Sequence, residues 1–467
     1  MSQVEDNKKT ILTGKVLPTL MNLSYPIIIA MTCQTAFKFI DTYFVSRLGR
    51  EAIAAMSLTF PFFIFLIALA IGLSIGTSSL VARTIGAGNI EETQKGAKNA
   101  ILLALIAGVI FTGGGIVLAP YLVSFMGATG QIYDYTLQYV VVILSASLLK
   151  YGFNVLDGTI RGEGNTRVSM VMMITAILTN IILDPLLIFG IWFFPRLEMA
   201  GAALATGISW GVGCCVVIVY YLMGKGIIRL NFKGFRLDLR SMMEIIKVGF
   251  PSALSHASMA ITILFLSRII LNMEGGEEII AAYGLGFRIE MVALLPVVGL
   301  RVGTIIMVGQ NYGAGLFKRV NDINHKGNLY VFLIMILVGL VYALVAPFVM
   351  GLFTRDANIL NLGVQYMRYV ALSYGFIGMG MVSNASFQGM GRGFPPLVNT
   401  ALRLIVFQLS LAYLFGIILE KGAPGIWAGI FLSNIMYGLI SYLWVNFVLK
   451  IKKEEEINKE GLLDSKV

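Results

Sequence analysis

The sequence contains few charged residues. Asp, Glu, Lys and Arg make up 13% of its 467 residues, whereas a soluble domain usually carries about 25%. This scarcity excludes an ordinary soluble enzyme, and the 57% share of hydrophobic residues excludes an intrinsically disordered chain. The composition therefore indicates an integral membrane protein.

Residues that bind metals or perform covalent chemistry are also scarce. The three cysteines, Cys33, Cys214 and Cys215, lie in apolar segments, which argues against a disulfide framework or a zinc site. The glycine-rich segments at 86–88 and 162–164 lack the GxxxxGK[ST] pattern of a phosphate-binding loop. No nucleophile–base pair stands out. We therefore expect no cofactor, no ATP binding and no enzymatic activity.

Long apolar stretches dominate what remains. A membrane-spanning helix needs about 20 mostly apolar residues, whereas a β-barrel shows segments of roughly ten residues that alternate in hydrophobicity. The sequence predicts an all-α integral membrane protein. Its twelve predicted spans are 16–46, 53–82, 99–121, 133–156, 168–193, 200–223, 249–272, 279–309, 327–353, 360–388, 395–418 and 425–449.

Lysine and arginine are distributed unevenly between the predicted spans. If the amino terminus lies inside, most of these residues fall in the inner segments, with a dense group between 225 and 247. The positive-inside rule then predicts a multi-pass protein of the cell membrane with both termini in the cytoplasm. The net charge of +10 is explained as an orientation signal, so we do not expect nucleic-acid binding.

The two halves of the chain repeat each other. Residues 72–77 match 299–304 at a spacing of 227, and Pro26 similarly corresponds to Pro251. Six spans in each half give both halves the same orientation, and such parallel repeats are typical of transporters. The predicted organisation is an N-terminal six-helix lobe over 1–226, a cytoplasmic linker over 227–248, and a C-terminal lobe with its tail over 249–467.

Particular motifs now carry a resemblance that covers nearly the whole chain. They are Tyr25-Pro26 through Asp41, Arg161-Gly162-Glu163-Gly164-Asn165 and, most specific, Asn180-Ile181-Ile182-Leu183-Asp184-Pro185. With twelve spans in a six-plus-six repeat, the sequence resembles the multidrug and toxic compound extrusion (MATE) transporters, closest to the DinF-like branch. The resemblance implies a monomer with a V-shaped pair of lobes that alternate between inward-open and outward-open states. It also implies antiport, in which amphipathic, often cationic, organic compounds leave in exchange for H⁺ or Na⁺.

Ionisable side chains inside spans are costly and suggest function. Asp41 lies in the first span; alternatively, solvent wets it near the outer end. Asp184 lies in the fifth span, and Asn180 is one turn earlier on the same helical face. Asp184 could instead only satisfy the backbone that Pro185 disrupts.

The resemblance implies that these residues form one cation site. The matching positions are Asp41, Asn180, Asp184 and Thr206, the last from the sixth span. Two adjacent carboxylates could share a proton, and their oxygens, with an amide carbonyl and a hydroxyl, could bind Na⁺. Either ion would relieve the repulsion and permit the first helix to bend at Pro26.

Lys38 departs from the family pattern, which usually has asparagine at this position. It is three residues before Asp41, so the two side chains could pair. We hypothesise that Lys38 replaces or competes with a sodium ion and favours protons as the coupling ion. In the alternative, Lys38 faces another cavity or extends to the membrane edge.

The C-terminal half lacks equivalents of the two aspartates. Its exception is Glu290, two residues after Arg288, which either forms a local ion pair or lines a cavity. Asp157, on the fourth span, either lines the N-terminal lobe or lies at the cytoplasmic surface. These three residues are secondary candidates.

Another function remains open at this level. The wider superfamily includes flippases for lipid-linked oligosaccharides and other lipids, which often have extra spans and several arginines in a central cavity. Twelve spans without such a cluster in the sequence favour the multidrug exporter.

Overall fold

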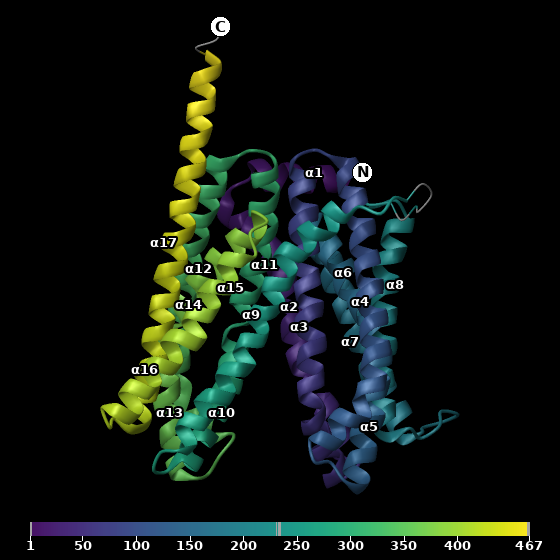
Figure 1. Ribbon diagram of the computed structural model, residues 1–467, viewed down its shortest axis with the longest axis vertical. Helices are drawn as coiled ribbons and strands as arrows, with labels where there is room; N and C mark the ends of the chain where they lie inside the picture. The colour runs from purple at the N-terminus through teal and green to yellow at the C-terminus, as the bar shows by residue number, and fades with distance from the viewer. Residues whose placement is uncertain (1, 230, 232–234, 465–467) are drawn as a thin grey trace. The chain divides into compact units, whose positions relative to one another are not determined.

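The computed structural model describes residues 2–229, 231 and 235–464. All regular elements in this part of the chain are helices, joined mostly by short loops (Figure 1). The chain divides into two compact units. The first contains the residues up to Lys9 and Pro26–Ala253, and the second contains Thr10–Tyr25 and the residues from Leu254 onward.

Each unit has its own set of helices. The first contains α3 (Arg50–Gly86), α4 (Ile90–Phe125), α5 (Gly130–Ser145), α6 (Ser147–Gly162), α7 (Thr166–Phe189) and α8 (Glu198–Leu222). The second contains α10 (Gly276–Ala293), α11 (Leu295–Gly313), α12 (Phe317–Gly351), α13 (Ala357–Ala371), α14 (Tyr374–Gly389), α15 (Phe394–Ala401), η1 (Leu402–Gln408), α16 (Leu409–Tyr413), η2 (Leu414–Ile418) and α17 (Gly422–Asp464). The remaining helices, α1 (Ser2–Thr13), α2 (Val16–Ser46) and α9 (Leu239–Leu271), each contribute residues to both units.

The all-helical fold class is confirmed. Among the described residues, nine helices are long and apolar enough to cross a membrane, and two bent pairs, α5 with α6 and α10 with α11, raise the number to eleven. The predicted span 360–388 is divided between α13 and α14. The α10–α11 pair bends by 46° just before Pro296. Proline is favoured in the first turn of a helix, because it has no N–H that would be left without a partner there.

Two segments group differently from the predicted lobes. Residues 10–25 pack with the second unit, and 227–253 pack with the first as far as they are described; residues 230 and 232–234 of the predicted linker lie outside the described residues. Helix α9 begins at Leu239, ten residues before the predicted span. The boundaries between the two units in α2 and α9 thus lie close to Pro26 and Pro251, which correspond to each other in the repeat.

Glycines of the repeat explain these exchanges. At Gly76 on α3, an added Cβ would lie 2.3 Å from the carbonyl oxygen of Ile245 on α9. At Gly303 on α11, the equivalent position, it would lie 2.6 Å from Ser24 Oγ and 3.0 Å from Leu20 Cδ1 on α2. Small residues permit such close approach of helices, so the same helix crossing recurs in each unit.

The segment after α8 is held to the first unit by polar contacts. Asp238 accepts hydrogen bonds from the Ser241 hydroxyl at 2.6 Å and the Arg240 N–H at 3.2 Å, and pairs with Lys95 at 3.1 Å. The Ser241 hydrogen bond and the Lys95 ammonium lower the pKa of the Asp238 carboxyl. This aspartate therefore anchors the start of α9 in its ionised form.

Glu163, in the loop between α6 and α7, is a second anchor with the opposite behaviour. Its Oε1 accepts from the backbone N–H of Ile228 at 3.0 Å, and the side chain is buried. Burial raises the pKa of the Glu163 carboxyl to about 7, from an ordinary value of 4.5. The folded protein thus keeps a proton that the unfolded chain loses, so stability falls as the pH rises through this range.

Replacement of Glu163 by Gln is expected to remove that loss. Gln keeps an oxygen for the Ile228 N–H and does not ionise, so the variant should gain roughly 1–3 kcal/mol of stability at pH 8. At pH 4.5 this gain should vanish. The measurement is the thermal midpoint in detergent at both pH values, with Glu91→Gln, which alters an exposed acid, as the control. Equal gains for both variants, or a gain at pH 4.5, would contradict this account.

Candidate ion-coupling site

Asp184 and Asn180 form a buried pair on α7. The Asn180 amide Nδ2 donates to Asp184 Oδ1 at 2.8 Å, and Asp184 has no exposed surface. The second oxygen, Oδ2, is buried without a hydrogen-bond partner in the described part of the chain. Because a buried, unsatisfied carboxylate oxygen is costly, this atom is a natural place for a proton or a small cation.

Asp41, on the part of α2 that belongs to the first unit, lies close enough to Asp184 for electrostatic interaction. The phenol of Tyr139, on α5, is within the same range of both carboxylates and is itself buried. The structure therefore brings three elements together around two carboxylates. Two like charges in one low-dielectric site are relieved when one of them takes up a proton or both share a cation.

Thr206 is not hydrogen-bonded to this group. Its hydroxyl donates to the carbonyl oxygen of Ala202, one turn earlier on α8, at 3.0 Å. Such bonding to the preceding turn is a common state of threonine within a membrane helix. The hydroxyl oxygen keeps acceptor capacity, and its role as an ion ligand remains a prediction.

Lys38 does not form the expected pair with Asp41 in the described part of the structure. Its side chain is exposed, and its electrostatic neighbour is Lys150 on α6. The i,i+3 spacing thus permitted a contact that the side chains do not make. Sequence spacing could not reveal Lys150 as the neighbour, because it lies more than 100 residues further along the chain.

Asp157 occupies a buried ion pair and not the surface. Arg161 Nη2 lies 2.7 Å from its Oδ2, and the Ser169 hydroxyl donates to its Oδ1. All its strong partners lie at the junction of α6 and α7. The geometry therefore supports a structural role for Asp157.

Glu290 is buried on α10 of the second unit. It accepts a hydrogen bond from the Tyr366 hydroxyl at 2.5 Å and interacts electrostatically with Arg403 on η1. Arg288 is exposed, and no ion pair joins it to Glu290 among the described residues. Residues two apart on a helix lie on different faces, so the local ion pair is not made.

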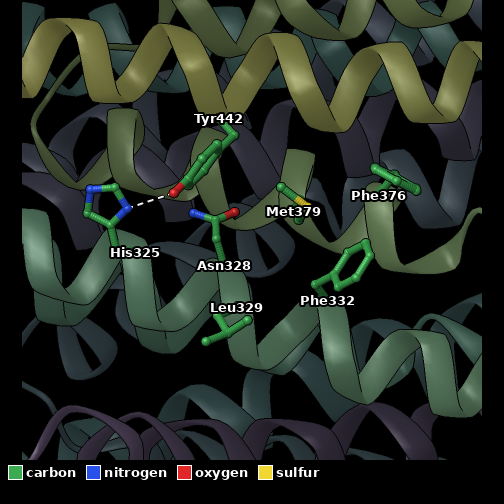
Figure 2. A pocket seen from close by; sticks show the side chains of 7 residues that line it. All are labelled: His325, Asn328, Leu329, Phe332, Phe376, Met379 and Tyr442. Carbon is green, nitrogen blue, oxygen red and sulfur yellow. Dashed lines mark hydrogen bonds between the residues drawn. The ribbon is translucent and has the colours of Figure 1, made fainter.

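A cavity of about 330 Å³ also lies within the second unit, and the sequence did not predict it. Its lining comes from α12, α14 and α17 and is mostly apolar (Figure 2). At one end His325 Nδ1 lies 2.6 Å from the Tyr442 hydroxyl. The cavity contains no carboxylate among its lining residues, so it is not a second site of the kind that Asp41 and Asp184 form.

The chain is similar to known proteins along most of its length. The MatE family model matches residues 26–186 and 251–414. An FAD transporter of Shewanella oneidensis is 29% identical over 443 residues, which cover 92% of this chain and 95% of that protein. A probable multidrug resistance protein NorM of Thermotoga maritima is 26% identical over 428 residues, covering 91% of each chain. The outward-facing structure of a multidrug resistance MATE family transporter of the MOP superfamily is 31% identical, with a TM-score of 0.89, over 95% of this chain and 98% of that one.

Proposed function

This chain belongs to the MatE family of multi-pass membrane transporters, and from this premise we propose that it is a secondary active antiporter. It exports amphipathic, often cationic, organic compounds in exchange for H⁺ or Na⁺. Relatives named as a multidrug resistance protein and an FAD transporter support an organic substrate. We place the transporter in the cell membrane as a monomer with both termini in the cytoplasm.

The observation that carries this proposal is the unpartnered oxygen of Asp184 beside a second carboxylate. Asp184 is fully buried, Asn180 satisfies only one of its oxygens, and Asp41 adds a like charge. A membrane interior makes this arrangement costly unless an ion binds. The site therefore favours ion uptake, which is what an ion-coupled transporter requires.

The position of Pro26 links ion binding to movement. Proline has no N–H to donate to the carbonyl four residues earlier, that of Asn22, so α2 is weakened at this turn. The division between the two units falls immediately before Pro26, and Asp41 lies beyond it on α2. When the ion discharges Asp41 and Asp184, repulsion between α2 and α7 falls, and α2 can bend at Pro26. Ion release on the other side of the membrane reverses the change.

Export by the purified protein tests the proposal. Proteoliposomes are loaded with the fluorescent cation rhodamine 6G. They should release the dye when the concentration of H⁺ or Na⁺ outside is raised above that inside. We expect transport to stop when the corresponding ionophore collapses that gradient, and to persist when the other gradient is collapsed. Transport that needs neither ion, or that occurs only with added ATP, would contradict the antiport mechanism.

A further inference from the structure

Two lysines lie inside membrane-spanning helices of the first unit, and neither forms an ion pair with an acid among the described residues. Lys38 on α2 and Lys150 on α6 interact electrostatically with each other. Among the described residues neither ammonium has a carboxylate within 4 Å. Intramembrane cations are expensive and usually serve a function, and two that repel each other are more expensive than one.

Lys150 forms no ion pair with a carboxylate in the described part of the structure. Asp157, two turns along α6, attracts the Lys150 ammonium more strongly than Lys38 repels it, but its oxygens are already bound to Arg161 and Ser169. Aromatic rings are the close neighbours instead, with Lys150 Nζ 4.7 Å from the centre of the Trp210 ring. Cation–π contact stabilises an ammonium through a ring face but leaves N–H donors for another ligand.

We propose that Lys38 and Lys150 together bind the anionic group of an amphipathic organic substrate, that is, its carboxylate, sulfonate or phosphate. An anion near both ammonium groups converts their repulsion into two attractive contacts. Lys38 is exposed and Lys150 half-buried, so both are open to a ligand. Trp210 and Phe153, the latter 5.8 Å from Lys150 Nζ, supply apolar surface for the remainder of the compound.

This inference rests on the proposed function for the export step and adds a substrate charge that this function did not include. The ion-coupling carboxylates are separate groups. Asp41 is one turn beyond Lys38 on α2, without an ion pair to it among the described residues. One helix would therefore carry a residue for each of the two exchanged species.

Equilibrium binding to the purified full-length protein in detergent is the test. The probes are two xanthene dyes of similar shape and opposite charge, 5-carboxyfluorescein and rhodamine 6G, followed by fluorescence anisotropy. The wild type should bind 5-carboxyfluorescein, and Lys38→Met and Lys150→Met should each weaken this binding about tenfold, as expected for the loss of one charge-assisted hydrogen bond. Lys38→Arg and Lys150→Arg should keep it within about threefold, because the charge remains.

Lys225→Met is the matched control, since it removes the same charge from the loop after α8. Size-exclusion profiles and thermal midpoints identify a variant that fails to fold, and the arginine variants then carry the test. The proposal is overturned if the wild type does not bind the anionic dye. It is also overturned if both Lys→Met variants bind that dye as Lys225→Met does.

Transport separates this proposal from the proposed function. If anion binding depends on both lysines but proteoliposomes move neither dye under any ion gradient, the anion site stands and the export function fails. If rhodamine 6G is exported with ion coupling and anion binding ignores the lysines, the export function stands and the anion site fails.

Discussion

Asp184→Asn is expected to lower ion-coupled export by roughly a hundredfold. The carboxylate is the only group at the site that combines full burial, one satisfied oxygen and one unpartnered oxygen in the described structure. Asn cannot take up a proton and is a weaker ligand for Na⁺. The loss of a charged contact of about 2–3 kcal/mol corresponds to this factor. Asp41→Asn should act in the same direction.

The fold should survive this substitution. Asn at position 184 keeps an oxygen that accepts from Asn180, and it removes a buried charge without a counter-ion, which stabilises or leaves stability unchanged. The measurement is the initial rate of rhodamine 6G export from proteoliposomes, together with the thermal midpoint. A comparison with Asp157→Asn is informative, because that change weakens the buried partner of Arg161 and should lower stability.

Normal ion-coupled export by Asp184→Asn would rule out the N-terminal site. The coupling group should then be sought at Glu290, the buried carboxylate of the second unit. Loss of export together with loss of folding would point to a structural role for Asp184, which the measured thermal midpoint decides.

Gly76→Ala is expected to give one of the largest losses of stability among single-methyl changes in the first unit. The new Cβ would lie 2.3 Å from a backbone oxygen of Ile245, which cannot rotate away as a side chain can. The helices α3 and α9 must separate, and overpacking of this kind costs about 1–3 kcal/mol or more. The exchanged segment of α9 would then be held less firmly.

Two further glycines make this prediction specific. Gly303→Ala meets mainly side-chain atoms of Ser24 and Leu20, so its loss should be smaller. Gly113→Ala on α4 meets nothing within 4 Å, and alanine is a better helix former, so it should be neutral or stabilise by up to about 1 kcal/mol. The thermal midpoints of the three variants, measured in one detergent, should be lowest for Gly76→Ala, higher for Gly303→Ala and highest for Gly113→Ala. A Gly76→Ala protein as stable as Gly113→Ala would refute the close crossing.

Much of the candidate site could be predicted because its chemistry is local. Asn180 and Asp184 are one turn apart on a helix whose existence the hydropathy indicates, so their contact follows from helical spacing. The association with Asp41 came from family resemblance and not from spacing. Helical spacing alone did not predict the neighbour of Lys38. Asp41 lies three residues later on the same helix, but Lys38 interacts electrostatically with Lys150.

The sequence by itself determined the helical membrane class, the positions of the apolar helices and the two-fold repeat. These properties depend on the bilayer thickness and on the order of residues along the chain, both of which a linear pattern records. Only the tertiary structure decided that 10–25 pack with the second unit and 239–253 with the first, that Ser169 on α7 binds Asp157, and that Tyr366 binds Glu290. Each of these results depends on which helices meet and on which faces of those helices are in contact. Close packing of glycine against a distant backbone sets that choice, and hydrophobicity along the chain does not encode it.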